Sequence, residues 1–275
     1  MLGLLLLQVL ASCLRLGHSE VETPFDSCPQ FFYAGIPPND ALNPKNPAWI
    51  CQYYNNSYHY ATLYDRDKRI PVYSAYKYRP GSGNRSPNWF VEPQLINTTY
   101  SKDMDKEMSI INRYNITPQE IGQSQAINQD YKGLKDLDRG HLSPSGHQSG
   151  NNSKWATFTL TNIVPQNSTL NQGQWKGYEN QTMPQKTQGC TTTYVITGAV
   201  PGNTYIPNGR VNVPSHIWSA ACCLGGDEAP KDAWGAIAEN NKNEVKVLSL
   251  EELEKRLTEH YKGKVTLFNK ACPRN

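Results

Sequence analysis

The chain has 275 residues, of which 37% are hydrophobic, and a formal net charge of +3. This length suits one large domain or two small ones with a proper buried core, and the sequence shows no internal repeat or low-complexity tail. The charge is mildly basic at most and does not by itself indicate a nucleic-acid-binding protein.

The N-terminal residues 1–13 are almost wholly apolar and are followed by the small residues Gly17-His18-Ser19. This pattern is typical of a secretory signal peptide, so we expect cleavage after residues 1–19. The apolar run is shorter than the roughly 20 residues of a membrane-spanning helix, and no later segment approaches that length. We therefore predict a secreted, extracellular protein without a membrane span.

Cysteine usage agrees with export, because loss of Cys13 with the leader leaves an even number of cysteines. Cys28 and Cys51 lie near each other in a loop-rich stretch and can close a local bridge. Adjacent cysteines rarely pair with each other, so we expect Cys222 and Cys223 to pair with Cys190 and Cys272, in either order. Glycosylation sequons are abundant, as in a secreted glycoprotein. They begin at Asn55, Asn84, Asn97, Asn115, Asn151, Asn167 and Asn180.

In chain order, residues 20–57 are expected to form a disulfide-tied N-terminal segment, followed by the main domain over residues 58–275. Period-2 alternation predicts strands over Tyr58–Tyr64 and Ile70–Tyr78, joined by a charged turn as a hairpin. Met104, Met108 and Ile111 at helical spacing predict a short helix over Ser101–Tyr114. A capping box from Thr117 to Glu120, with proline at the first helical position, predicts a second helix.

The second half of the chain alternates between strand and helix patterns. Predicted strands are Trp155–Leu160, Thr191–Thr197, Val211–Val213 paired with His216–Ala221, Val245–Leu248 and Lys264–Phe268. Predicted helices begin at Ser168, continuing through Gln172–Glu179, and at Ser249, with Leu250, Leu253 and Leu257 as a buried stripe. Because these elements lack βαβ regularity, we predict an α+β fold with a mainly antiparallel sheet and packed helices.

The stretch most suited to chemistry is Asp138-Arg139-Gly140-His141. It places a base that titrates near neutral pH beside a permanent cation, the groups needed to deprotonate water and stabilise an anionic transition state. Downstream, Asn171 and Glu179 are a little over two helical turns apart and can face the same side of one helix. A neutral carboxamide suits Mg²⁺, which keeps most of its waters.

These residues resemble the DNA/RNA non-specific endonuclease family, whose active site is a ββα-metal (His-Me finger) unit. The resemblance covers roughly Tyr58 to the C-terminus. It is carried by Asp138-Arg139-Gly140-His141, Thr161-Asn162-Ile163-Val164-Pro165-Gln166, Leu170-Asn171-Gln172-Gly173-Gln174-Trp175 and Glu179. It implies Mg²⁺-dependent hydrolysis of DNA and RNA with little sequence specificity, through phosphate contacts, and it makes a homodimer plausible. Mn²⁺ is the alternative metal.

The resemblance also implies a role for each residue. His141 matches the general base, Asn171 the carboxamide that binds Mg²⁺, and Glu179 an acid that holds water bound to the metal. Asn162 matches a residue that shapes the site near the base. Arg139 matches a cation over the phosphate, and Arg85 matches a second one, more loosely because Ser86-Pro87 is inserted beside it. The family's arginine beyond the glutamate is missing here, so that contact is absent or comes from Lys186.

Each of these residues also has an ordinary structural reading. Asn171 could cap a helix, Glu179 could be a solvated carboxylate, and Arg139 could pair with Asp138, which we interpret as orienting the turn. Among the other histidines, His59, His147 and His260 are expected to be polar loop residues and His216 a core residue.

The alternative function is a secreted binding glycoprotein that keeps the nuclease fold with little or no activity. The missing arginine favours it, and so do the sequons at Asn84, Asn167 and Asn180, where a glycan would crowd the cleft. Hydrolysis of a different phosphodiester is a third hypothesis.

Overall fold

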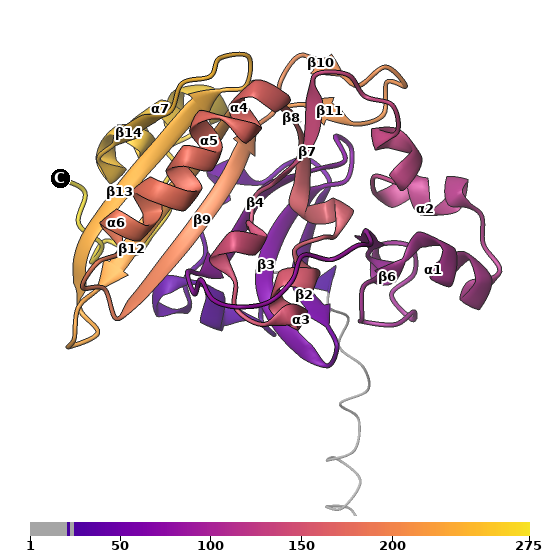
Figure 1. The fold of residues 1–275 in the computed structure, drawn as a ribbon, viewed down its shortest axis with the longest axis horizontal. Helices are drawn as coiled ribbons and strands as arrows, with labels where there is room; N and C mark the ends of the chain where they lie inside the picture. Colours follow the sequence, from indigo (N-terminus) through magenta and orange to yellow (C-terminus); the bar gives the residue numbers. More distant parts are fainter. Residues whose placement is uncertain (1–20, 23–24) are drawn as a thin grey trace, which may run out of the picture.

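An eight-stranded antiparallel sheet forms the centre of the molecule (Figure 1). The computed structural model describes residues 21–22 and 25–275, so the predicted signal peptide lies outside the described residues. In sheet order the strands are β1 (Val21–Glu22), β2 (Pro47–Tyr54), β3 (Ser57–Asp65), β4 (Ile70–Lys77), β9 (Thr192–Val200), β12 (His216–Leu224), β13 (Pro230–Glu239) and β14 (Lys246–Leu248). Both the α+β class and the antiparallel sheet agree with the sequence prediction.

Smaller elements surround this sheet. Three two-stranded pairs are β5 (Phe90–Val91) with β6 (Asp105–Lys106), β7 (Leu137–His141) with β8 (Ile163–Asn167), and β10 (Thr204–Tyr205) with β11 (Asn212–Val213). The helices are α1 (Glu107–Tyr114), α2 (Pro118–Ser124), α3 (Asn151–Ala156), α4 (Ser168–Gln172), α5 (Gln174–Gly177), α6 (Met183–Lys186) and α7 (Leu250–Tyr261). Between α5 and α6 runs a π-helix, η8 (Tyr178–Thr182).

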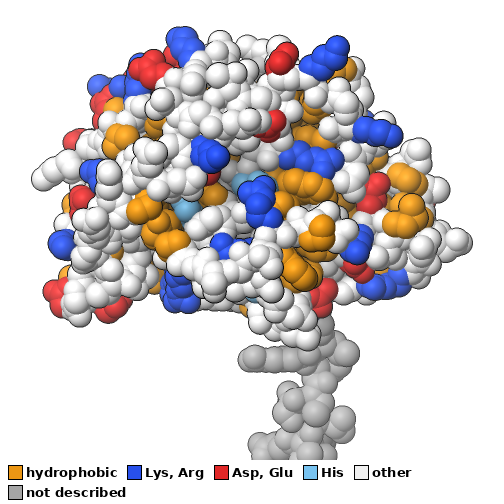
Figure 2. Space-filling model, viewed as in Figure 1, with side chains coloured by type: hydrophobic (Ala, Val, Ile, Leu, Met, Phe, Trp, Pro, Cys, Tyr) orange, Lys and Arg blue, Asp and Glu red, His pale blue; other side chains and the backbone are white. Residues whose placement is uncertain are grey.

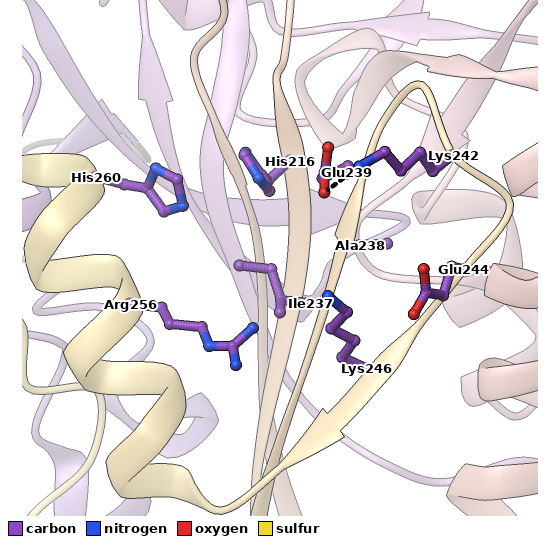
Figure 3. A pocket seen from close by; sticks show the side chains of 9 residues that line it. All are labelled: His216, Ile237, Ala238, Glu239, Lys242, Glu244, Lys246, Arg256 and His260. Carbon is purple, nitrogen blue, oxygen red and sulfur yellow. Dashed lines mark hydrogen bonds and ion pairs between the residues drawn. The ribbon is translucent and has the colours of Figure 1, made fainter.

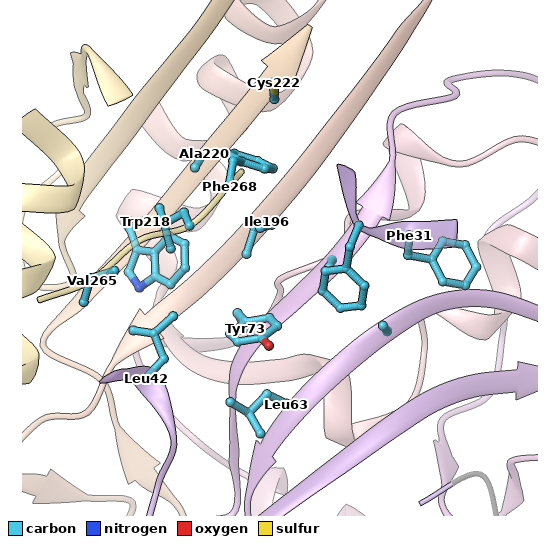
Figure 4. Packing of buried hydrophobic residues seen from close by; sticks show 14 of the residues in the cluster. Phe31, Leu42, Leu63, Tyr73, Ile196, Trp218, Ala220, Cys222, Val265 and Phe268 are labelled. Carbon is cyan, nitrogen blue, oxygen red and sulfur yellow. The ribbon is translucent and has the colours of Figure 1, made fainter. Parts of the chain in front are cut away.

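Each face of the sheet carries its own core, because successive residues of a strand point to opposite sides. On one face Trp218, Ala220 and Cys222 belong to a buried cluster that includes the leucines of α7. Val265 lies beside Trp218 and Phe268 beside Ala220 in this cluster (Figure 4). On the opposite face Ala221, Cys223 and Trp234 pack with Tyr178 and Met183 of the η8–α6 segment. The η8–α6 segment is therefore anchored on a buried face of the sheet.

The same alternation decides the disulfide pairing. Cys222 points toward α7 and bonds Cys272, whereas Cys223 points to the other face and bonds Cys190. The third bridge is Cys28–Cys51. Both the local bridge and the pairing of the adjacent cysteines with Cys190 and Cys272 are confirmed, and of the two orders that the sequence left open the structure selects one.

Several sequence predictions are confirmed element by element. The hairpin appears as β3 and β4, and the capping box at Thr117 opens α2 with both reciprocal hydrogen bonds. Ser249 accepts a hydrogen bond from the Glu252 N–H and so caps α7, whose predicted leucine stripe is buried.

Other predictions are wrong. Trp155–Leu160 is not a strand: α3 covers Asn151–Ala156 and the strand begins only at Ile163. An apolar run can be buried as helix or strand, and periodicity alone does not separate the two. The helix predicted over Ser101–Tyr114 is present only in its second part: β6 comes first, and α1 then runs from Glu107 to Tyr114. Met104 is buried before that helix, while Met108 is 64% exposed.

Strand pairing around Pro214 also differs from the prediction, because β11 pairs with β10 and β12 pairs with β9 and β13. Lys264–Phe268 forms no strand, since side chains bind its backbone: Asn39 accepts from the Thr266 N–H and Glu254 from the Leu267 N–H. Strands β2 and β13 were not predicted. The apolar residues of β2 alternate too irregularly to signal a strand.

Candidate active site

The candidate site is built on a strand–strand–helix unit formed by β7, β8 and α4. β7 and β8 are antiparallel, with Arg139 opposite Pro165 and His141 opposite Ile163. Helix α4 begins directly after β8, where the Asn167 side chain accepts from the N–H groups of Thr169 and Leu170. This unit is the ββα architecture that the sequence resemblance implied.

Gly140 allows β7 to lie close to β8. A Cβ atom at this position would overlap the side chain of Gln166. The glycine between Arg139 and His141 is therefore a steric requirement of the unit. The side chains of Arg139 and His141 emerge on the same side because they are two residues apart on the strand.

A cleft of about 390 Å³ opens beside this unit. It is lined by Gly83, Arg85, Arg139, His141, Pro144, Ser145, Gly146, Lys154, Asn171, Gln172, Lys176, Glu179 and Asn180. Figure 2 shows histidine atoms in a hollow near the middle of this face, with lysine and arginine side chains around it. Four lysines or arginines and one acid line the cleft, so its electrostatic potential favours an anionic ligand.

His141 is held with one ring nitrogen available. Its Nε2 is buried and has no hydrogen-bond partner among the described residues, while the ring makes a hydrogen bond to the Arg139 backbone, which leaves Nδ1 as the bonded atom. The rings of Trp89 and Phe158 lie 5.4 and 4.8 Å from the imidazole, centroid to centroid. Burial, and then the charge of Arg85, lower the pKa of His141 to about 3. The imidazole is therefore neutral at physiological pH.

Asn171 lies across the cleft, and its orientation is set by Asp138. The Asn171 Nδ2 donates to Asp138 Oδ2 at 2.8 Å, Gln172 Nε2 donates to the same oxygen at 2.9 Å, and Ser168 Oγ donates to Oδ1 at 2.8 Å. Burial by itself raises the pKa of Asp138, but these three hydrogen bonds outweigh it and the pKa falls below its usual value. With Nδ2 occupied, the Asn171 carbonyl oxygen is the atom left for a ligand.

The helix after Asn171 is not continuous, contrary to the sequence prediction. It breaks at Gly173 (φ −101°, ψ −113°), where the Asn243 side chain accepts from the Gln174 N–H. A Cβ atom at Gly173 would collide with the Thr169 carbonyl and with Asn243. A further irregularity, η8, contains Glu179. The break at Gly173 lies between Asn171 and Glu179, and the π-helix contains Glu179. The position of Glu179 relative to Asn171 is therefore not that of an ideal α-helix.

Glu179 lines the same cleft as His141 and Asn171. Burial raises the pKa of its carboxyl to about 8, and the neighbouring Trp175 and Arg85 oppose that shift only in part. A divalent cation nearby would favour the carboxylate form. The carboxyl group is thus sensitive to any positive charge that enters the cleft.

The two predicted arginines both line the cleft and rest on aromatic rings. Arg139 lies over Trp89 and Tyr131, 4.8 and 5.4 Å from the ring centroids. Arg85 lies 5.0 Å from the centroid of Phe158, and its Nη1 approaches Ser145 Oγ at 3.5 Å. The rings restrict the orientation of each guanidinium group but do not neutralise its charge, so both groups can bind an anion.

Asn162 lies beneath the site and is not among the residues that line the cleft. Its carbonyl oxygen accepts from Ser74 Oγ and the Ser143 N–H, and its amide donates to the carbonyls of Ser143 and Thr157. It is fully buried and ties the loop after His141 to strand β4. Its place in the structure is that of a support for the loop.

Asp138 was predicted only to orient its own turn, but it also accepts a hydrogen bond from Asn171. Lys154 and Lys176 line the cleft and were not predicted. Nothing in the sequence around those lysines marks them. Lys186, considered as a substitute for the missing arginine, lies 5.7 Å from the ring centroid of Trp234 and does not line the cleft.

A second, smaller hollow lies between β12, β13 and α7 (Figure 3). The rings of His216 and His260 face each other there at 4.4 Å between centroids, beside the Glu239–Lys242 ion pair. His216 is half-buried at the start of a strand and His260 is on α7, so neither histidine belongs to the cleft. In the part of the chain that the structure describes, no group of three or more His, Cys, Asp or Glu side chains is arranged to hold a metal ion.

The fold and the cleft together define a protein of the ββα-metal architecture. A family model of the DNA/RNA non-specific endonucleases matches residues 37–270. The chain therefore belongs to the DNA/RNA non-specific endonuclease family, as the sequence resemblance indicated.

Similar proteins agree with this assignment. The endonuclease domain-containing 1 protein of Homo sapiens is 35% identical over 209 residues, which are 74% of this chain and 40% of that protein. The Mus musculus protein of the same name is 32% identical over 263 residues, covering 91% and 48%. The chain thus spans less than half the length of these curated relatives.

More distant similarity is found to the mitochondrial nuclease EXOG of Mus musculus, at 26% identity over 172 residues, covering 58% of this chain and 45% of that protein. Among solved structures, a chain from the crystal structure of the EndoG/EndoGI complex superposes with a TM-score of 0.51 at 16% identity, covering 78% of this chain and 84% of that one. This last likeness concerns the fold alone.

Proposed function

We propose that this chain is a secreted, divalent-metal-dependent endonuclease that hydrolyses phosphodiester bonds of DNA and RNA with little sequence preference. The observation that carries the proposal is the joint position of His141, Asn171 and Glu179 in one cationic cleft. The three disulfides support passage through an oxidising compartment. Within the described residues no helix is long and apolar enough to span a membrane.

In this proposal His141 is the general base. Because its Nδ1 is bonded to a backbone group, the neutral ring keeps the lone pair on Nε2, which no described residue engages. His141 lines the cleft, so this nitrogen is the atom that would take a proton from the attacking water. Its low pKa means that this lone pair is free at every physiological pH. Desolvation also weakens the imidazole as a base, so proton transfer requires an acidified water.

The residues present fit a magnesium ion. Asn171 offers a neutral carbonyl oxygen whose direction is fixed by Asp138, and Glu179 offers a carboxyl group close by. Mg²⁺ retains several waters and takes few protein ligands, so one carboxamide suits it. When bound, the ion supplies Lewis-acid stabilisation of phosphate charge and lowers the pKa of water. Mn²⁺ prefers similar oxygen ligands.

Arg139 and Arg85 would hold the phosphate and stabilise its added negative charge. Lys154 Nζ donates to the Ser145 carbonyl at 3.1 Å, and Lys176 lies exposed at the rim, so the first fixes the cleft wall and the second extends the basic surface. Contacts to phosphates rather than base edges explain low sequence preference and predict rates that fall as salt rises.

The test is cleavage of plasmid and of single-stranded RNA by the purified protein with Mg²⁺, with and without chelator. His141→Ala should slow cleavage by about 10²–10⁴-fold, the usual contribution of a general base. His260→Ala is the matched control, since that histidine lies on α7 outside the cleft, and it should cleave like the wild type. Chelator-resistant cleavage, or equal rates for wild type and His141→Ala, would overturn the proposal.

One observation favours the alternative, a binding glycoprotein with little activity. Asn180, which begins a sequon, is exposed and lines the cleft beside Glu179. A glycan there would narrow the access of a polymeric substrate. Glycopeptide mapping of the secreted protein, with the cleavage assay repeated on Asn180→Gln, separates the two functions: full occupancy at Asn180 with activity only in the variant supports the binding function.

A further inference from the structure

His147 is buried but makes two directed hydrogen bonds, although its sequence context predicted a polar loop residue. It ends the short 3-10 turn η6 (Ser145–His147), six residues after His141, and is 3% exposed. Its Nδ1 lies 2.9 Å from Tyr76 Oη on strand β4, and its Nε2 lies 3.1 Å from the backbone carbonyl oxygen of Glu179. The ring of Tyr78 packs edge-on against it at 4.8 Å between centroids.

The carbonyl group of Glu179 has lost its donors within the helix. In a regular α-helix it would accept from the N–H of Met183, but that N–H donates to Tyr178 in the π-helical pattern. In a π-helix it would accept from residue 184, which is a proline and has no N–H. A buried carbonyl without a donor is costly, so the imidazole replaces the missing backbone donor.

Pro184 also explains why the π-helix exists. In a continuous α-helix its ring would clash with the carbonyl of Asn180, four residues earlier. The widened turn over Tyr178–Thr182 avoids this clash and shifts Glu179 relative to the preceding helix. The burial of Tyr178 against the sheet, with Trp234 Nε1 donating to its hydroxyl at 3.3 Å, fixes the other side of the same turn.

The protonation state of the ring follows from its partners. A carbonyl oxygen can only accept, so Nε2 carries the proton, and in the neutral ring Nδ1 accepts from the Tyr76 hydroxyl. Burial, opposed by the bond to Glu179, lowers the pKa of His147 to about 4, which agrees with a neutral ring.

The loop that joins His141 to His147 is itself held from several sides. Asn162 bonds both backbone groups of Ser143, Gln148 Nε2 donates to Ser143 Oγ, and Lys154 donates to the Ser145 carbonyl. The two walls of the cleft are thus joined through a short, rigid path from His141 to His147 and on to the backbone of Glu179.

We infer that His147 is a positioning residue, which holds the π-helical turn in register so that the Glu179 carboxyl group faces His141 and Asn171 across the cleft. This role rests on the proposed nuclease function. The imidazole contacts neither substrate nor reacting atoms in this role and acts through the backbone of Glu179.

Two near-isosteric variants separate the two hydrogen bonds. His147→Gln places an amide N–H near the position of Nε2 and can still donate to the Glu179 carbonyl. His147→Asn reaches only as far as Nδ1 and cannot. We expect His147→Asn to lower kcat for Mg²⁺-dependent plasmid cleavage by about 10–100-fold at nearly unchanged KM, as for groups that orient a metal site indirectly. His147→Gln should recover most of this loss.

Thermal unfolding midpoints of both variants are measured beside the rates. Equal activity of His147→Asn and wild type would overturn the inference. So would an equal loss in both variants, because the loss would then not depend on the donor to Glu179. If either variant fails to fold, the side-chain nitrogen-15 spectrum of the wild-type protein decides whether the inference stands.

This second readout does not depend on nuclease activity. Histidine side-chain nitrogen-15 spectra of the wild type should show the His147 ring neutral with its proton on Nε2, slow to exchange with solvent between pH 6 and 8. The signal is assigned by its loss in His147→Gln, or in Tyr76→Phe by its shift. A charged ring, or a proton on Nδ1, would overturn the inference even if the enzyme is active. An inactive wild type with the expected spectrum would instead count against the proposed function alone.

Discussion

Asp138→Asn is the perturbation that most directly tests how Asn171, the proposed metal ligand, is oriented. In the wild type one carboxylate accepts three hydrogen bonds, of 2.8, 2.8 and 2.9 Å, from Ser168, Asn171 and Gln172. An asparagine at this position keeps the shape, its one amide oxygen can accept from both Asn171 and Gln172, and its NH2 group can donate to the Ser168 hydroxyl. The bonds to Asn171 and Gln172 therefore persist but lose their charge assistance.

The expected size of the effect follows from those bonds. A hydrogen bond to a charged group contributes about 1.5–3 kcal/mol, and a neutral one about 1 kcal/mol. Replacing the charge-assisted bond on the Asn171 amide by a neutral one therefore weakens the hold on its carboxamide by roughly 0.5–2 kcal/mol, which lowers metal affinity by about 2–30-fold. Because Asp138 is partly exposed, solvent screening places the effect toward the lower end of this range.

The assay is the Mg²⁺ concentration for half-maximal plasmid cleavage, together with calorimetric titration of Mn²⁺ in the absence of substrate. Both should shift by about 2–30-fold in Asp138→Asn. Ser168→Ala is the matched control, since it removes the bond at the start of α4 and leaves the Asn171 amide paired with the carboxylate. Its metal dependence should stay that of the wild type. Wild-type metal affinity in Asp138→Asn, or an equal shift in the control, refutes the argument that Asp138 orients Asn171.

Two further predictions concern stability. Glu92 is buried and accepts hydrogen bonds from the hydroxyls of Thr159 and Thr161, yet burial raises its pKa to about 7. Because the pKa of Glu92 is higher in the folded than in the unfolded state, the free energy of unfolding falls as pH rises from about 4.5 past 7, by about 3 kcal/mol. Glu92→Gln should flatten that part of the pH profile, measured by urea unfolding. An unchanged slope in the variant would show that Glu92 does not titrate in this range. Cys272→Ser opens a bridge that spans 50 residues and should lower the free energy of unfolding by about 2–4 kcal/mol, measured by denaturant unfolding. This bridge joins β12 to the C-terminal segment on the face opposite the cleft, so the nuclease rate of the folded fraction should remain that of the wild type. A fall in that rate would contradict this separation of the bridge from the cleft.

The sequence patterns whose structural predictions were confirmed are those that involve residues close together in the chain. The capping box at Thr117, the N-cap at Ser249, the charged turn before Ile70 and the leucine stripe of α7 all depend on neighbours within a few residues. The boundaries failed where distant contacts decided the conformation. Trp155 lies in a helix whose end packs under β3, with the Tyr60 hydroxyl donating to the Ala156 carbonyl, a contact 96 residues away in sequence.

The motif Asp138–His141 and the residues Asn171 and Glu179 could be chosen from the sequence as candidates, since their chemistry is visible in their side chains. The positions of these side chains relative to one another could not be predicted from the sequence. That Asp138 reaches 33 residues ahead to Asn171, that Asn162 lies under the loop and not in the cleft, and that Lys154 lines it all depend on how β7, β8 and α4 close on each other.

For this protein the sequence by itself determined the class of fold, the set of cysteines and the side chains able to do the chemistry, because these follow from composition, short-range pattern and family motifs. Only the tertiary structure decided which cysteine pairs with which, since the two faces of β12 separate Cys222 from Cys223. It also decided that His147 supports Glu179, because Pro184 removed a backbone donor that only a folded neighbour could replace.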